Sequence, residues 1–222
     1  IKNYPDAIQL AEKKNVFLTS AFKDGFFEVQ EASSQKIGEL LDVQEGMRVV
    51  DACAGAGGKT LHLAALMKNK GQIIALDIYE WKLTELKRRA KRAGAHNIET
   101  RLISDNKVIK RLHEKADRLL IDAPCSGLGV LKRNPDSKWK IDQAFIDRIK
   151  GEQQQILQDY SKILKKGGQM IYATCSILPS ENNEQVKLFL SNNPDFTLVK
   201  DQKIMPSEGY DGFYMALIKR NA

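Results

Sequence analysis

The sequence predicts an α/β fold in which a mainly parallel, seven-stranded sheet carries helices on both faces and ends in an antiparallel strand. The first observation is a regular alternation, from Met47 onward, of short apolar runs with helical stretches, which favours parallel strands joined by crossover helices. The second is that the last apolar run, at 212–219, follows the run at 196–199 with no room for a helix. The last strand is therefore expected to return antiparallel.

Each element of this sheet is predicted from its own run of residues. The expected strands are residues 47–51, 72–77, 98–103, 117–122, 169–174, 196–199 and 212–219. The expected helices are residues 59–67, 81–93, 106–112, 141–164 and 183–191. Ligands of such sheets bind outside the carboxyl ends of the strands, so the residues that follow those ends are the first candidates for a site.

The part of the chain before the sheet has its own pattern. Pro5 and Asp6 are typical of a helix start and predict a short helix at 4–15. A short extended piece is expected at 25–30, and a second helix at 33–42, where apolar residues share one face.

Two domains follow from this division. Residues 1–44 are expected to form a helical linker segment, and residues 45–222 the catalytic domain. Because the chain begins at Ile1 and not at Met, we also expect a further N-terminal domain.

Charge and hydropathy restrict the partners of the chain. The net charge of +7 and the pI of about 9.2 favour a polyanion. A basic cluster of Lys132, Arg133, Lys138 and Lys140 lies in a loop beside a suspected site. No apolar run approaches the ~20 residues that a membrane-spanning helix needs, so no membrane partner is expected.

The three cysteines, Cys53, Cys125 and Cys175, lie far apart in the sequence. Zinc sites use paired spacings such as C-x-x-C, which are absent here, so no metal is expected. A disulfide framework is not expected for so few cysteines in a chain of this size. The three residues are therefore predicted to be reduced thiols of a cytoplasmic protein.

A glycine-rich turn at 51–60 separates the first predicted strand from its helix, where backbone amides can approach a ligand closely. A dinucleotide turn would need a third glycine, and Thr60 stands in its place. The phosphate loop G-x-x-x-x-G-K-[ST] fits at its end, but Cys53 occupies the place of its first glycine. With Asp122 as the magnesium-holding aspartate, a P-loop nucleotide hydrolase remains an alternative.

S-adenosylmethionine is the third candidate for this turn, and the downstream spacing favours it. Asp77 closes the second predicted strand 26 residues after Asp51, where a carboxylate accepts ribose hydroxyls. Asp105 follows the third predicted strand, where an adenine amino group is expected. One such aspartate can equally be a helix cap, but three at successive strand ends favour a bound nucleoside.

Two of the thiols are predicted to share a pocket. Cys125 follows the fourth predicted strand, Cys175 follows the fifth, and a serine comes directly after each. Neighbouring strands lie ~4.8 Å apart, so both side chains are expected at one edge of the sheet. Free cysteine is usually buried packing, and Cys53 is interpreted in that way.

A cysteine thiolate has a specific use in pyrimidine chemistry. Carbon-5 of a pyrimidine is a poor nucleophile until a thiolate adds to carbon-6 and turns the ring into an enamine. After carbon-5 has taken a methyl group, a base must remove its proton so that the thiol is expelled.

These segments resemble a known family. Residues 122–127, Asp-Ala-Pro-Cys-Ser-Gly, and 173–176, Ala-Thr-Cys-Ser, look like the two signature motifs of the Nop/Sun family of S-adenosylmethionine-dependent RNA cytosine-5 methyltransferases. The resemblance covers nearly the whole chain, including the Gly-Gly-Lys-Thr turn and the segments at 28–34, 131–139, 178–182 and 211–216. One departure is Gly55-Ala56, where the family usually has Ala-Pro. The resemblance implies a class I methyltransferase (Rossmann-like) fold.

The resemblance also implies residue roles. The cysteine of the family's Thr-Cys-Ser motif is the nucleophile, which corresponds to Cys175, and the Pro-Cys cysteine assists product release, which corresponds to Cys125. DNA cytosine-5 methyltransferases use the Pro-Cys thiol as nucleophile instead. Asp122 and Lys59 are implied to lie near the target base.

Cofactor and partner follow from the same resemblance. The implied contacts to S-adenosylmethionine fall on Cys53, Ala54, Gly55, Ala56, Gly57, Gly58, Lys59, Asp77, Asp105 and Asp122. Lys132, Arg133 and Lys138 are candidates for phosphate contacts with RNA. The implied protein is a monomer that modifies ribosomal RNA, with transfer RNA as the competing substrate, and releases S-adenosylhomocysteine. A non-catalytic RNA-binding scaffold that keeps the fold is the second alternative.

Overall fold

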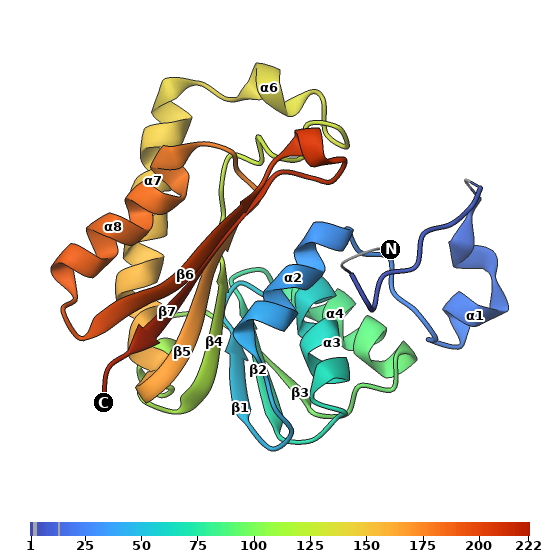
Figure 1. Cartoon of the computed structure of the whole chain (residues 1–222). Coiled ribbons are helices and arrows are strands. Elements are labelled where there is room, and N and C mark those ends of the chain that lie inside the picture. Colours follow the sequence, from blue (N-terminus) through green and yellow to red (C-terminus); the bar gives the residue numbers. More distant parts are fainter. Residues whose placement is uncertain (2–3, 13) are drawn as a thin grey trace.

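The structure, a computed structural model, describes residues 1, 4–12 and 14–222. The described residues form one seven-stranded sheet in the order β3-β2-β1-β4-β5-β7-β6 (Figure 1). The strands are β1 Arg48–Asp51, β2 Gln72–Asp77, β3 Ile98–Leu102, β4 Ala116–Asp122, β5 Leu164–Thr174, β6 Phe196–Ile204 and β7 Phe213–Arg220. Every neighbouring pair is parallel except those of β7, which runs antiparallel to β5 and to β6. The predicted fold class, that of the class I methyltransferases, is confirmed.

Helices cover both faces of this sheet. Helices α2, α3 and α4 pack on one face, and α5, α7 and α8 on the other (Figure 1). The helices are α1 Ser20–Lys23, α2 Ala32–Leu41, α3 Gly58–Leu66, α4 Glu80–Arg92, α5 Asn106–Lys110, α6 Ser137–Lys140, α7 Gln143–Tyr160 and α8 Asn183–Asn192. Short 3-10 turns lie at Val16–Leu18, Ser161–Ile163, Pro179–Glu181 and Pro206–Glu208. Within the described residues, no helix has the length and apolar character that crossing a membrane requires.

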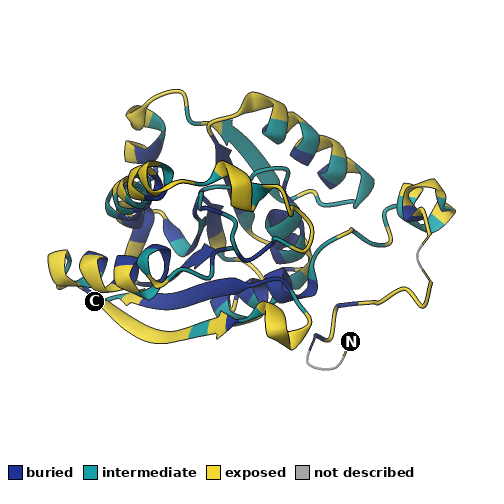
Figure 2. Cartoon of the chain, turned by 90° about the horizontal axis from the view of Figure 1, so that it is seen from above, coloured by how far each residue is buried: buried dark blue, intermediate teal, exposed yellow. Residues whose placement is uncertain are grey.

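The central strands form the core. Val49 of β1 and Leu120 of β4 pack with α2 and α3, whereas the next residues, Val50 and Ile121, pack with the helices of the opposite face. All four side chains are fully buried, and Figure 2 shows the centre of the molecule buried between exposed outer helix faces. Truncating one such side chain to alanine costs about 2–5 kcal/mol for Leu or Ile. The carboxyl ends of β1, β4 and β5 therefore continue from the most deeply buried part of the sheet.

The helix predicted at 4–15 is wrong. The described part of this segment forms turns and irregular chain, and Lys13 lies outside the described residues. Tyr4 and Ala7 pack against Ala32, but Ile8 is 87% exposed. Tyr4, Ala7, Ile8 and Ala11 have the spacing of a helix face, but only Tyr4 and Ala7 are buried, so tertiary packing does not stabilise a helix here.

Several other elements also differ from their predicted bounds. The segment at 25–30 joins no strand of the sheet. Strands β5 and β6 are longer than predicted, because most of their additional residues, at 164–168 and 200–204, are charged, polar or glycine and form no apolar run. Residues 200–204 of β6 are mostly exposed and are held by pairing with β7. The sequence has no apolar run there that would predict this pairing. The helix predicted at 33–42 is confirmed as α2, and the other predicted helices are found within a few residues of their expected ends.

Candidate active site

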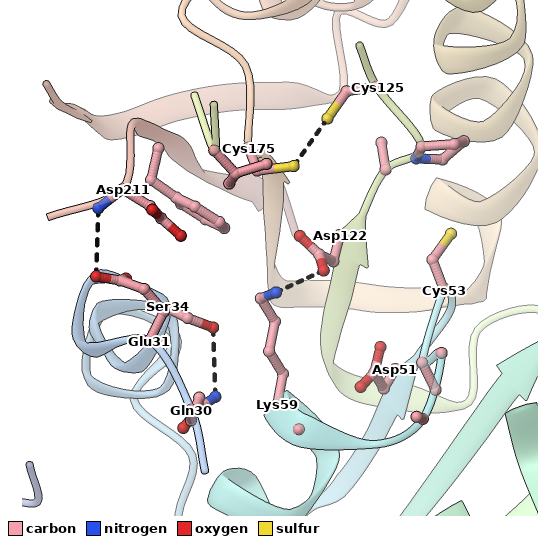
Figure 3. A pocket seen from close by; sticks show the side chains of 18 of the residues that line it. Gln30, Glu31, Ser34, Asp51, Cys53, Lys59, Asp122, Cys125, Cys175 and Asp211 are labelled. Atoms are coloured by element: carbon pink, nitrogen blue, oxygen red, sulfur yellow. Dashed lines mark hydrogen bonds and ion pairs between the residues drawn. The ribbon is translucent and has the colours of Figure 1, made fainter. Parts of the chain in front are cut away.

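A cavity of about 650 Å³ opens at the carboxyl ends of β1, β4 and β5, within the volume range of small-ligand sites (Figure 3). Its walls come from the turn after β1, from the loops after β4 and β5, from the segment that leads into α2 and from the start of β7. The lining residues are Val29, Gln30, Glu31, Ser34, Asp51, Cys53, Ala54, Gly55, Ala56, Gly58, Lys59, Asp122, Ala123, Pro124, Cys125, Val130, Arg133, Cys175, Asp211 and Phe213.

The glycine-rich turn is shaped by backbone geometry. Gly57, the N-cap of α3, has φ +88°, and a Cβ there would lie 2.5 Å from Leu86 Cγ. Only glycine satisfies both conditions. The Gly55 N–H donates to Asp77 Oδ2 at 2.9 Å, which ties the turn to the end of β2. The turn thus presents main-chain groups at the N-terminus of α3, a position that suits a polar ligand.

Asp51 lies at the bottom of this turn and is 1% exposed. Its Oδ2 accepts a hydrogen bond from Thr60 Oγ1 at 2.7 Å, and Oδ1 has no partner among the described residues. Burial is the main cause that raises the pKa of Asp51 to about 7, against the lowering effect of the Thr60 hydrogen bond. An unpartnered buried carboxylate oxygen beside a cavity suits a cationic group of a ligand.

The thiols of Cys125 and Cys175 meet in this cavity, with Sγ atoms 3.3 Å apart (Figure 3). The hydrogen bond that it shares with Cys125 lowers the pKa of Cys175, although burial opposes this. The same contact, together with burial, raises the pKa of Cys125 well above the usual value of a thiol. Each thiol can thus stabilise a thiolate on the other, and the cation of Lys59 additionally lowers the pKa of Cys175.

Lys59 and Asp122 form an ion pair next to these thiols, with Nζ and Oδ2 2.5 Å apart (Figure 3). Burial alone would lower the pKa of Lys59, but the charge and hydrogen bond of Asp122 raise it. Lys59 is thus a cation held by a carboxylate at the end of β4. A lysine held in this way is not directed at a phosphate, as the lysine of a P-loop would be.

Cys53 lies apart from the other two cysteines, on the turn side of the cavity (Figure 3). Burial is the first cause that raises its pKa well above the usual value, and nearby carboxylates add to the effect. Its thiol stays protonated, as a packing role requires.

Some of the predicted site residues do not line the cavity. Gly57 shapes the turn from behind, and Asp77 accepts hydrogen bonds from the N–H groups of Gly55 and Tyr79. Asp105 caps α5 by accepting from the Lys107 N–H at 2.8 Å. Lys132 and Lys138 are exposed outside the cavity, whereas the third predicted RNA contact, Arg133, lines it.

Several lining residues were not singled out from the sequence. Glu31 caps α2, and its Oε1 accepts from the Asp211 N–H at 3.3 Å, which joins the N-terminal segment to the loop before β7. Arg133 forms an ion pair with Asp211, whose side chain is 6% exposed. Gln30 donates to Ser34 at 3.3 Å. In the sequence, only the resemblance of the segments at 28–34 and 211–216 to the family indicated that these residues belong to the site.

A metal site is not formed by the described residues, where no group of three or more His, Cys, Asp or Glu side chains is arranged to hold an ion.

Known proteins resemble this chain over most of its length. The family model described as 16S rRNA methyltransferase RsmB/F matches residues 38–219. The ribosomal RNA small subunit methyltransferase B of Proteus mirabilis is 37% identical over 221 residues, which are 98% of this chain and 52% of that protein. The chain thus spans about half the length of the curated relatives it matches.

Solved structures share the fold closely. The crystal structure of PH0851 superposes with a TM-score of 0.90 at 34% identity, covering 94% of this chain and 50% of that one. The structure of NSun6 from Pyrococcus horikoshii with SFG superposes with a TM-score of 0.85 at 28% identity, covering 95% of this chain and 57% of that one.

Proposed function

The chain belongs to the RsmB/F family of 16S rRNA methyltransferases, and we propose that it transfers a methyl group from S-adenosylmethionine to carbon-5 of a cytosine in RNA. The names of its relatives support ribosomal RNA as the substrate class. The observation that carries the proposal is the pair of thiols 3.3 Å apart in one cavity with the glycine-rich turn. A reaction at carbon-5 of cytosine needs a thiolate and a second group beside it.

The residues present fit S-adenosylmethionine. Asp51 Oδ1, buried and unpartnered among the described residues, suits a cationic group of the cofactor. The Asp77 carboxylate accepts one N–H on each oxygen and keeps lone pairs for ribose hydroxyls. Gly55 and Gly58 line the cavity and place no side chain in it. When bound, this cofactor supplies the methyl group on a positively charged sulfur.

The first half of the reaction is assigned to Cys175. Its thiolate forms a bond to carbon-6, and the electrons of the carbon-5–carbon-6 double bond move into the ring, which takes a proton on its nitrogen. Asp122 is proposed to hydrogen-bond that protonated nitrogen, and Lys59 holds Asp122 in place at 2.5 Å. Carbon-5 is then nucleophilic enough to accept the methyl group.

The second half is assigned to Cys125. After transfer, carbon-5 carries the new methyl group and its original proton. When water takes that proton, the double bond forms again, the carbon-6–sulfur bond breaks, Cys175 leaves as a thiolate, and the ring nitrogen returns its proton to solvent. Cys125 lies 3.3 Å from Cys175 and is proposed to assist this release.

The arrangement of domains and partners completes the proposal. Residues 45–222 are proposed as the methyltransferase domain, and the segment at 1–44 covers one side of its cavity. Lys132, Arg133 and Lys138 are proposed to contact RNA phosphates. The ribosomal RNA named for the relatives supports a cytoplasmic place of action.

The two alternatives are less well supported. A P-loop hydrolase needs Lys59 at a phosphate, but Asp122 holds its ammonium group. A scaffold without activity has no use for two coupled thiols in a cavity.

The proposal is tested by incubating the protein with isotopically labelled S-adenosylmethionine and unmodified small-subunit ribosomal RNA, followed by digestion to nucleosides and mass spectrometry. The expected product is labelled 5-methylcytidine, with transfer RNA as the comparison substrate. A label on another base or position contradicts the proposal. Stabilisation by ATP without stabilisation by S-adenosylmethionine, measured as a rise in Tm, supports the hydrolase instead.

A further inference from the structure

The two serines that follow the cysteines share one binding partner. Ser126 follows Cys125 and Ser176 follows Cys175, and the two side chains are buried with their Oγ atoms 3.2 Å apart. Ser126 Oγ donates to Glu181 Oε2 at 2.5 Å, and Ser176 Oγ donates to the same oxygen. One carboxylate therefore joins two loops whose cysteines are 50 positions apart in the sequence.

The other oxygen of this carboxylate extends the connection. Glu181 Oε1 accepts from the Ser126 N–H at 2.7 Å and from Gln153 Nε2 at 3.1 Å. Gln153, on α7, also donates to the carbonyl oxygen of Pro124 at 2.9 Å, directly before Cys125. Both sides of Cys125 are thereby fixed relative to Glu181.

The buried charge of Glu181 needs an explanation. Its residue is 0% exposed, and among the described residues no lysine, arginine or histidine forms an ion pair with it. A buried carboxylate without a counter-charge is costly, and an apolar side chain of similar volume fills such a space more favourably. The hydrogen bonds go to the loops of the two thiols, so the carboxylate acts on how these loops lie relative to each other.

We propose that Glu181 is a positioning residue, which holds the thiols of Cys125 and Cys175 in contact by binding the serine after each of them. The purpose of this contact rests on the proposed function, in which one thiol attacks and the other assists release. The contact itself belongs to the protein alone, so its test needs neither RNA nor S-adenosylmethionine. A failure of the methyl-transfer assay and a failure of this proposal are thus separate results.

The test is the substitution Glu181→Gln, which keeps the size of the side chain. It replaces one carboxylate oxygen by an NH2 group, which cannot accept the hydrogen bonds that this oxygen accepts from its neighbours. We expect the loops to separate and Cys175 to lose its hydrogen bond from Cys125. The readout is alkylation of Cys175 by iodoacetamide in the reduced protein, followed across pH by peptide mass spectrometry. The midpoint should move up by about one pH unit, which is about a tenfold lower rate at neutral pH.

The direction of this shift separates two explanations. The other groups that act on Cys175 are Asp122, on β4, and Lys59, on α3, and neither is changed. Removing the negative charge of Glu181 without moving the loops would favour thiolates and shift the midpoint down. An upward shift supports the positioning role, and a downward shift or none overturns it.

Tyr172→Phe is the matched control. The Tyr172 hydroxyl donates to the main-chain oxygen of Glu181 at 2.7 Å, so this variant removes a buried hydrogen bond of the same turn without touching the carboxylate. Its midpoint should equal that of the parent protein, and an equal upward shift in both variants would mean general loosening and overturn the proposal. If Glu181→Gln does not fold, Ser126→Ala, which removes one of the two hydroxyls, is judged by the same results.

Discussion

The two halves of the cavity are built by different means. The half after β1 is made of main chain: Gly57 adopts φ +88° against Leu86, and the Gly55 N–H is anchored to Asp77. The half after β4 and β5 is made of side chains, where two thiols lie in contact and a buried carboxylate lies behind them.

The two halves should therefore tolerate different kinds of substitution. The main-chain half depends on the absence of a Cβ and on one buried acid, so it should respond to changes of shape and of ligand charge. The side-chain half depends on protonation, because the pKa values of its two thiols move in opposite directions through one hydrogen bond. Changes there should alter reactivity more than stability.

The largest effect is expected at Lys59, whose side chain extends from α3 to Asp122 in the side-chain half. Lys59→Met removes the counter-charge of Asp122 and a cation that lowers the pKa of Cys175. Methyl transfer measured in a single turnover should fall by roughly 100-fold or more. Lys162→Met, at an exposed ion pair with Asp159, is the control and should keep its rate. An unaffected Lys59 variant would mean that charge does not govern this half.

A steric effect should follow in the main-chain half. Gly57→Ala would place a Cβ 2.5 Å from Leu86 Cγ at a positive φ, at a cost of about 1–3 kcal/mol. Thermal unfolding should show Tm lower by roughly 5 °C. Gly58→Ala meets nothing closer than 4.0 Å and should fold with nearly the parent Tm. Equal Tm values for the two variants would show that the contact of a Cβ at position 57 with Leu86 does not affect stability.

Asp51 should make cofactor binding depend on pH. Its pKa of about 7 means that the carboxylate, the form that attracts a cation, is lost as pH falls through that value. Affinity for S-adenosylmethionine in calorimetry should fall by up to about tenfold per pH unit below 7. In Asp51→Asn the affinity should be weaker and nearly independent of pH between 6 and 8.

The same pKa has a consequence for the ligand-free protein. The charged form of this buried carboxyl is the costly one, so stability falls as pH rises from about 4, the usual pKa of an aspartate, to about 7 and is constant above that value. The Tm of the ligand-free protein should therefore fall across this range less in Asp51→Asn than in the parent. A pH dependence that survives the substitution unchanged would assign it to another group.

The smallest effect is expected in the loop beside the cavity. Lys132→Ala, at an exposed residue of this loop, should weaken RNA binding roughly fivefold at low salt and reduce the slope of log affinity against log salt by about 1. Lys166→Ala, an exposed cation at the opposite end of β5, serves as the control. Equal losses in the two variants would show that net charge alone attracts the RNA.

The sequence predicted correctly the features that a short run of residues determines by itself. The apolar runs of β4 and β5 predicted that Cys125 and Cys175 would follow neighbouring strands, and the structure brings them together. The prediction failed at 4–15, where Pro5 and Asp6 indicate a helix start but Ile8 and Ala11 stay exposed and are not packed against the rest of the fold. Local propensity is a weak prior when tertiary packing does not reward it.

Contacts between distant parts of the chain were beyond this kind of prediction. A serine after each cysteine was visible in the sequence, but the shared partner Glu181 appears only when the loops fold together. The contact of Glu31 with Asp211 spans 180 positions, and no spacing rule connects two such residues. Asp105 shows a different difficulty. Its position after β3 suits a ligand contact, but the same position also lets its carboxylate cap α5.

The central claim is that Cys175 attacks the base and Cys125 assists release. Its most direct test is a denaturing gel of Cys125→Ala and Cys175→Ala variants after incubation with S-adenosylmethionine and ribosomal RNA. A band shifted by covalently bound RNA is expected for Cys125→Ala alone, because the adduct forms and is not released. A shifted band for Cys175→Ala alone would contradict the account and assign the attack to Cys125.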